Sequence, residues 1–125
     1  MSAKTANTVS AQESLLVVRM AEHQLGLELE KLKALITKSS LKHGGELDIL
    51  IDVSKVKVSD EDAATVARAF FKNLPFRHMA VFGGSTAVNV GIKLILNLFI
   101  SPGVGEVKIF KSEEKARSWL MDASK

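Results

Sequence analysis

The chain has 125 residues, a length typical of one folded domain. Its hydrophobic share of 46% and charged share of 25% are ordinary for a globular protein and exclude a disordered one. The absence of cysteine excludes disulfides and thiol chemistry, and the net charge of +3 comes from interspersed residues of both signs, which predicts no nucleic-acid partner.

The first twelve residues are small and mostly polar, without the apolar stretch of a secretory signal. We therefore expect a cytoplasmic protein with a flexible tail over residues 1–13 and a single domain over residues 14–125. The most apolar run, residues 87–100, contains Asn89, Lys93 and Asn97 and is shorter than the roughly 20 residues that cross a bilayer. No membrane span is predicted.

After the tail, short apolar runs alternate with segments of helical periodicity. Residues 15–18 predict a strand, and the helix after it is predicted by Leu25, Leu29, Leu32 and Ile36. Residues 47–53 are apolar on both faces except at Asp48 and Asp52, which predicts a central strand of a parallel sheet.

The second half of the chain continues the alternation. Ser59 and the three acids after it begin a helix that Pro75 ends, and residues 78–82 form a third strand. A third helix begins near Ser85 or Thr86, and a fourth strand and a helix capped by Ser112 follow. The predicted fold is α/β, with four parallel strands, four helices and a core that includes Leu50, Val53, Val66, Phe70, Val81 and Ile109.

Ligands of open α/β sheets bind at the carboxyl ends of the strands, where the following helices begin. The residues expected there include Asp52, Ser54, Ser59, Asp60, Glu61, Asp62, Ser112 and the segment of Gly83, Gly84, Ser85 and Thr86. The glycine segment could hold an anion on its backbone amides, but it lacks a P-loop lysine and the three-glycine dinucleotide pattern. A tight turn followed by a helix cap is the favoured interpretation.

Metal and catalytic sites are not predicted, and no cofactor is implied. His23, His43 and His78 have no partner ligand at metal-binding spacing on the same element, and no Gly-x-Ser-x-Gly elbow occurs. His78 begins a strand whose opposite end leads to Ser85, so these two side chains cannot pair.

The third helix carries more apolar residues than one buried stripe needs. We expect either neighbouring helices or a partner to cover the surplus, and the partner would be a second copy of the chain, an apolar ligand or a membrane surface. The residues assigned to this apolar surface are Ile92, Ile95, Leu98 and Phe99.

Residues 51–63, Ile-Asp-Val-Ser-Lys-Val-Lys-Val-Ser-Asp-Glu-Asp-Ala, resemble the signature of STAS domains, the SpoIIAA-like anti-sigma-factor antagonists. Asp52, Ser54, Val56 and Asp60 match its spacing. Residues 69–120 are more similar to the branch grouped with Sec14-type (CRAL-TRIO) lipid-binding domains. The matching segments are Ala69-Phe70-Phe71, residues 79–83, Ser101-Pro102-Gly103, residues 106–110, residues 112–116 and Trp119-Leu120.

The resemblance implies the SpoIIAA-like fold, a four-turn β-α superhelix, and a further strand before Ser14. It also implies a regulatory role without catalysis, with a protein partner at the Asp52 to Asp62 segment. In the phospho-regulated members a serine follows the helix-opening Asp, whereas Glu61 stands there in this chain. Asp62 and Ala63 replace the family's next Ser and Gly. Switching by serine phosphorylation at this position is therefore not expected, and Glu61 is either a fixed charge or a helix cap.

Two functions are favoured from the sequence, and the less favoured third is an enzyme that uses the Gly83 to Thr86 turn as an oxyanion or phosphate site. The first is an anti-sigma-factor-antagonist-like interaction module, which rests on the Asp52 to Asp62 segment. The second is a carrier or sensor of an apolar small molecule or lipid, which rests on the third helix and the Sec14-like residues.

Overall fold

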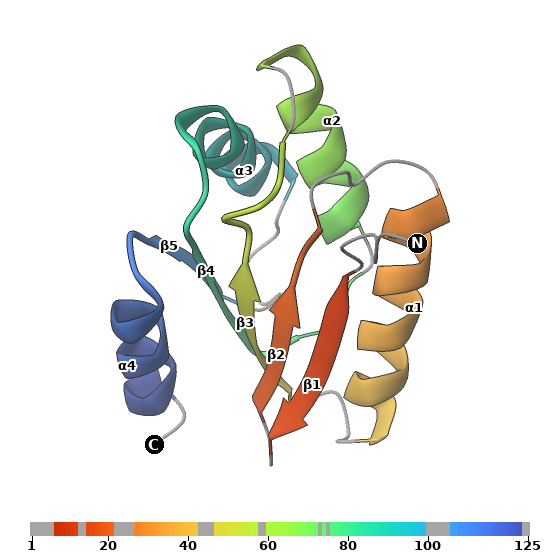
Figure 1. The fold of residues 1–125 in the computed structure, drawn as a ribbon, viewed down its shortest axis with the longest axis vertical. Coiled ribbons are helices and arrows are strands. Elements are labelled where there is room, and N and C mark those ends of the chain that lie inside the picture. Colours follow the sequence, from red (N-terminus) through yellow and green to blue (C-terminus); the bar gives the residue numbers. More distant parts are fainter. Residues whose placement is uncertain are drawn as a thin grey trace, which may run out of the picture.

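The computed structural model describes residues 7–12, 15–21, 27–42, 47–57, 60–72, 74, 76–99 and 106–123. Within them the chain forms five strands and four helices (Figure 1). In chain order these are β1 (Thr8–Gln12), β2 (Leu15–Arg19), α1 (Leu27–Lys42), β3 (Asp48–Asp52), α2 (Asp60–Phe71), β4 (His78–Phe82), α3 (Thr86–Phe99), β5 (Glu106–Phe110) and α4 (Glu113–Ala123).

The strands form one sheet in the order β1-β2-β3-β4-β5. Strands β2 to β5 are parallel, and β1 pairs antiparallel with β2. Each of the four parallel strands is followed by a helix, which confirms the predicted α/β class and its four β-α units. Strand β3 is the central strand, as its apolar residues on both faces predict, and four of its five residues are buried.

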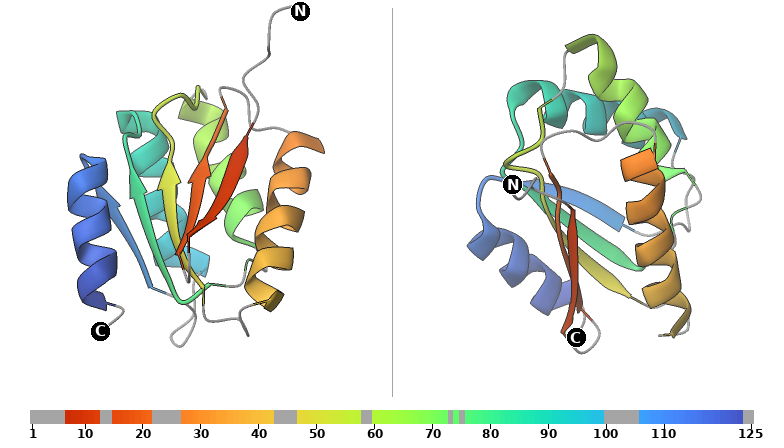
Figure 2. Two further views of the ribbon diagram at one scale, coloured as in Figure 1. Left: turned by 60° about the horizontal axis from the view of Figure 1, so that its bottom comes forward. Right: turned by 45° about the vertical axis from the view of Figure 1, so that its right-hand side comes forward.

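Helices α1, α2 and α3 cover one face of the sheet, and α4 alone lies on the other (Figure 2). The larger core lies under the three helices, and the smaller one lies between the sheet and α4. Four of the predicted core residues, Leu50, Val53, Phe70 and Val81, are buried. Val66 and Ile109 are only half-buried, the former beside an apolar pocket and the latter on the edge strand β5.

Helix starts follow the predicted capping residues where the structure describes them. The Ser85 hydroxyl accepts a hydrogen bond from the Val88 amide at 3.2 Å, and the Ser112 hydroxyl accepts one from the Lys115 amide at 3.3 Å. Helix α2 ends at Phe71, whereas the sequence predicts an end near Leu74, before Pro75. Ser59, Pro75 and Leu25 lie outside the described residues.

The tail predicted over residues 1–13 differs from the structure at residues 8–12, which form β1. The resemblance to STAS domains implied this additional strand. In register with β2, Val9 faces Val18 and packs against the larger core, while the other β1 residues are small or polar. Because a five-residue strand with one large apolar side chain has little periodicity of its own, its pairing with β2 decides its structure.

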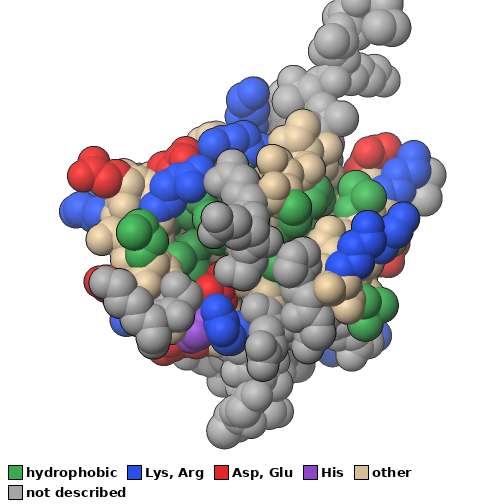
Figure 3. Space-filling view, turned by 90° about the horizontal axis from the view of Figure 1, so that it is seen from below, with side chains coloured by type: hydrophobic (Ala, Val, Ile, Leu, Met, Phe, Trp, Pro, Cys, Tyr) green, Lys and Arg blue, Asp and Glu red, His purple; other side chains and the backbone are tan. Residues whose placement is uncertain are grey.

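None of the helices within the described residues is long and apolar enough to cross a membrane. Seen from below, at the amino ends of the parallel strands, acidic and basic side chains are interspersed with a few hydrophobic ones (Figure 3). The described residues on this face therefore carry charges of both signs.

Candidate functional site

The turn that follows β3 is held by the side chain of Asp52. The Asp52 Oδ1 atom accepts hydrogen bonds from the Ser54 amide at 2.9 Å and from the Ser54 hydroxyl at 2.6 Å. An aspartate that bonds the backbone two residues further on fixes a tight turn. We call residues 52–54 the Asp52 turn. It presents the exposed Ser54 at the carboxyl end of the central strand, where the sequence predicts the site.

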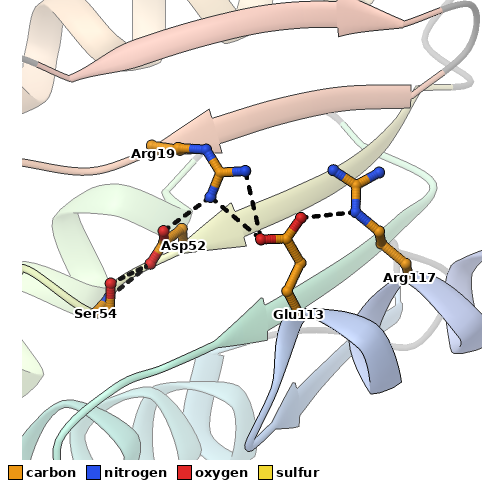
Figure 4. A network of polar contacts seen from close by, with 5 residues as sticks. All are labelled: Arg19, Asp52, Ser54, Glu113 and Arg117. Atoms are coloured by element: carbon orange, nitrogen blue, oxygen red, sulfur yellow. Dashed lines mark hydrogen bonds and ion pairs between the residues drawn. The ribbon is translucent and has the colours of Figure 1, made fainter.

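Three further side chains join the Asp52 turn in a polar network (Figure 4). Arg19 Nη1 lies 2.9 Å from Asp52 Oδ2, and both terminal nitrogens of Arg19 lie 3.4 Å from Glu113 Oε1. Arg117 Nε donates to Glu113 Oε2 at 2.8 Å. The network connects the ends of β2 and β3 to the first turn of α4.

The network keeps Asp52, Glu113 and Arg19 charged. Burial acts to raise the pKa of Asp52, but hydrogen bonds from Ser54 and Arg19 outweigh burial and lower the pKa below its usual value. Hydrogen bonds from Arg117 and Arg19 lower the pKa of Glu113, and those to Glu113 and Asp52 raise the pKa of Arg19. At neutral pH the surface therefore combines fixed charges of both signs.

Three members of this site, Arg19, Glu113 and Arg117, were not predicted from the sequence. The signal for Arg19 was its place at the end of the strand next to β3, because parallel neighbours end at the same edge of a sheet. In the register of β2 with β3, Arg19 lies directly beside Asp52. Arg117 follows Glu113 by four residues, a spacing that brings two side chains together on a helix.

The glycine segment after β4 lies against the Asp52 turn. Gly83 has a φ of +84°, and a Cβ atom built there would lie 2.9 Å from the Ser54 Cβ atom. The Val53 amide donates to the Phe82 carbonyl at 3.0 Å, which joins the two chain segments. The structure thus brings together two groups that were predicted separately, the Asp52 turn and residues 83–86.

The hydroxyls of the glycine segment fit the predicted turn and cap. Ser85 caps α3, and both Ser85 and Thr86 are exposed. The Asn89 side chain lies under Gly84, with Asn89 Nδ2 3.4 Å from the Gly84 carbonyl. Anion binding by residues 83–86 stays a prediction.

The acidic start of α2 is described in part. Helix α2 begins at Asp60, so Glu61 and Asp62 occupy its first turn, as predicted. Asp62 is exposed. Ser59 and the side chains of Asp60 and Glu61 lie outside the described part of the chain, so the cluster's contacts stay a prediction.

An apolar pocket lies between α2, α3 and the sheet. Its cavity volume is about 40 Å³. Its lining residues are all apolar: Met20, Ile51, Val53, Val56, Ala63, Val66, Ala67, Phe70, Phe71, Val81, Val88 and Ile92. Of the predicted apolar surface of α3, Ile92 therefore faces the pocket and is buried. The side chains of Ile95, Leu98 and Phe99 lie outside the described part of the chain.

A second polar cluster lies at the opposite end of the sheet. Asp48 is buried, and its two carboxylate oxygens accept from Arg77 Nε at 3.0 Å and Nη2 at 2.9 Å. The Nδ1 atom of His78 lies 3.0 Å from Asp48 Oδ1. This cluster was not predicted, although adjacent parallel strands place Asp48 beside His78. As predicted, β4 separates His78 from Ser85.

Comparison with curated proteins finds no match to this chain. The family described as SpoIIAA-like matches residues 15–121, from the first residue of β2 to the last turns of α4. The match covers the four parallel strands and the Asp52 turn, and it leaves β1 outside. Together with the fold, this match shows that the chain belongs to the SpoIIAA-like family of STAS domains.

Proposed function

We propose that this chain is a non-enzymatic, anti-sigma-factor-antagonist-like module that binds a protein partner through the Asp52 turn and the first turn of α2. STAS domains generally act as regulatory and interaction modules. The observation that carries the proposal is the fixed geometry of the Asp52 turn. The Asp52 turn is held in place before any partner binds. It is stabilised by two hydrogen bonds from Ser54, by the ion pair with Arg19 and by the close contact with Gly83.

A preformed, charged turn is well suited to recognition, because little conformational entropy is lost when it binds. The exposed groups of this surface are Ser54, Lys55 and Asp62, which can form hydrogen bonds and ion pairs with a partner. We propose that Glu61 adds a standing negative charge at the position of the family's phosphorylated serine. Binding would then be constitutive and would not depend on a kinase acting at this position.

Affinity capture from the native lysate with immobilised protein tests this proposal. Glu61→Lys should lose a partner that the unaltered chain retains, and higher salt should weaken the retained complex by screening. Asp122→Lys makes the same charge change on the exposed end of α4 and should retain the partner. Adding ATP or phosphatase to the lysate should leave recovery unchanged.

Equal recovery of every partner by Glu61→Lys and the unaltered chain would remove the binding role of this surface. Glu61→Ser separates the remaining possibilities. It should cost a few tenths of a kcal/mol if Glu61 only stabilises the helix start, with no change in capture. A fixed-charge role requires weaker capture by Glu61→Ser as well.

The apolar pocket favours a second candidate function, the binding of a small apolar molecule. Its lining is entirely apolar, and dry apolar cavities in proteins take up small apolar ligands. A volume of about 40 Å³ suits a short alkyl group and is too small for a whole lipid tail. The ligand would therefore insert one end between α2 and α3.

A fluorescent apolar probe titrated into the protein tests this second function. Ala67→Leu should fill part of the pocket and weaken probe binding, because Ala67 lines it. Thr65→Leu adds an apolar side chain on the exposed face of the same helix and should leave binding unchanged. Equal probe binding by the unaltered chain and Ala67→Leu would place the probe elsewhere.

We also propose that an apolar ligand covers the outer part of α3, and a second copy at this place is the competing interpretation. Val90 is 59% exposed on this helix. Ile95→Lys or Leu98→Lys should then lose the ligand with modest loss of stability, and either variant would give a monomer only if a second copy covers α3 instead. A cytoplasmic location, which the sequence predicts, also stays a proposal.

A further inference from the structure

Strand β5 forms one end of the sheet, and the described residues contain no strand that pairs with it on the side away from β4 (Figure 2). The other end differs, because β1 lies beside helix α1 (Figure 1). An unpaired edge presents backbone N–H and C=O groups that can bond another strand.

The register of β4 with β5 determines which backbone groups face outward. Glu106 lies beside His78, and its amide donates to the Arg77 carbonyl at 3.0 Å. Along a parallel strand, the backbone N–H and C=O groups of successive residues point alternately to the two sides. The groups that form hydrogen bonds with β4 are therefore those of Glu106, Lys108 and Phe110. Val107 and Ile109 therefore direct their N–H and C=O groups toward the free edge.

The side chains of β5 alternate between the two faces of the sheet. Val107 and Ile109 pack against the larger core, whereas Glu106 and Lys108 lie on the α4 face and are exposed. The Lys108 ammonium lies 5.6 Å from the centre of the Trp119 ring, which is on α4. Lys108 therefore lies over the face of the sheet. Edge lysines in other proteins can prevent the pairing of a further strand, but Lys108 does not block the edge of β5.

We propose that β5 pairs antiparallel with β5 of a second copy, across a twofold axis through Val107. In this register Val107 bonds Val107 of the second copy, and Glu106 of each chain lies opposite Lys108 of the other. Centring the pair on Lys108 would place two ammonium groups opposite each other, which is unfavourable. Centring it on Ile109 would leave Glu106 without a cross-strand partner, so the charges select Val107.

The resulting dimer joins two five-stranded sheets edge to edge and leaves the Asp52 turn and the apolar pocket of each copy unobstructed by the paired strand. Closed twofold pairs are the commonest homo-oligomers, and the same patch serves both copies. In this register only residues 106–108 of the two β5 strands lie opposite each other, which is a small interface, so the two charge pairs should have a large effect on dimer affinity. This proposal does not depend on the proposed function.

Sedimentation equilibrium of the full chain, across micromolar to millimolar concentrations, tests the charge pairing. Glu106→Lys and Lys108→Glu should each weaken the dimer by about tenfold or more, because each places like charges opposite each other twice. The double variant Glu106→Lys/Lys108→Glu restores both opposite-charge pairs and should recover the dimer. Lys108→Glu also removes the contact with Trp119. The double variant lacks this contact as well, so recovery of its dimer cannot come from that contact.

Val107→Pro tests the backbone pairing independently. It removes an N–H that faces the free edge, and the bonds from Glu106 and Lys108 to β4 remain. The variant should be monomeric while its circular dichroism spectrum stays native. If it does not fold, the charge series still decides the question.

Three results would overturn the proposal. The unaltered chain could remain monomeric at millimolar concentration. The double charge variant could fail to recover the dimer that both single variants lose. The dimer could survive both single variants and disappear with Ile95→Lys, which would place the second copy on α3.

Discussion

Gly83 is the residue at which the Asp52 turn and the start of α3 meet. Its φ of +84° lies in the left-handed region, and an added Cβ would approach the Ser54 Cβ atom at 2.9 Å and its Cα atom at 3.3 Å. We expect Gly83→Ala to lower the free energy of unfolding by about 1–3 kcal/mol, since both backbone strain and crowding oppose it. Urea denaturation measures this loss.

Thr86→Ala is the matched control, because Thr86 is exposed in the same segment. It should change stability by less than about 0.5 kcal/mol. A Gly83→Ala protein as stable as this control would show that the two loops separate readily. The preformed geometry of the Asp52 turn would then be in doubt.

Asp48 is a buried carboxylate whose pKa predicts a dependence of stability on pH. Burial acts to raise this pKa, but hydrogen bonds from Arg77 and His78 and their charges lower it below its ordinary value of 3.8. The unfolded chain therefore binds the proton more readily than the folded one. The stabilisation is present above the unfolded pKa and is lost as pH falls through the lower folded pKa.

The variant Asp48→Asn should consequently be less stable than the unaltered chain at pH 7, and the difference should shrink between about pH 5 and pH 3. Urea denaturation at several pH values measures both curves. The comparison isolates Asp48, because both chains retain the other carboxylates. A difference that stays constant down to the lowest pH would contradict the lowered pKa.

Helices α2 and α3 pack closely where Gly91 meets Ala63. A Cβ added at Gly91 would lie 2.8 Å from the Ala63 carbonyl carbon and 2.9 Å from its Cβ atom, too close for either helix to remain in place. We expect Gly91→Ala to cost about 1–3 kcal/mol by overpacking. It should also change probe binding in the pocket, which both helices line. Lys93→Ala, on the exposed side of α3, should do neither.

The elements that the sequence predicted well are those whose periodicity agrees with their burial. Strand β4 has its predicted bounds, and the α1 residues Leu29, Leu32 and Ile36 are buried at the predicted spacing. Strand β1 lacked such a signal because its structure depends on pairing with β2. Ile109 is less buried than its apolar character suggests because β5 is an edge strand, with a neighbouring strand on one side only within the described residues.

The candidate site was predicted in part. Asp52, Ser54 and the glycine segment followed from strand ends and helix starts along the chain. Arg19 and Glu113 are distant in sequence from Asp52 and meet it only through sheet register and the position of α4. Long-range ion pairs of this kind carry no local pattern, so the network required the structure.

At the scale of the whole molecule, the two faces of the sheet are covered unequally. Three helices bury the larger core, whereas α4 rests on a small cluster through the buried residues Ala116 and Leu120 and the half-buried Trp119. Since local opening depends on the contacts that it breaks, α4 should detach at a lower free energy than the sheet unfolds. Its detachment would also break the ion pair of Arg19 with Glu113.

Native-state hydrogen exchange of two variants tests this order of opening. Ile49→Val weakens the larger core and should lower the opening free energy of β3 amides by about 0.5–1.5 kcal/mol. The α4 amides should be unaffected, because the larger core stays intact when α4 detaches. Ala116→Gly should lower the opening free energy of both sets by about 1 kcal/mol, since α4 is lost in partial and in complete unfolding. If Ile49→Val lowers the protection of α4 and β3 equally, then α4 opens only with the whole molecule, and the smaller core is not an independent unit.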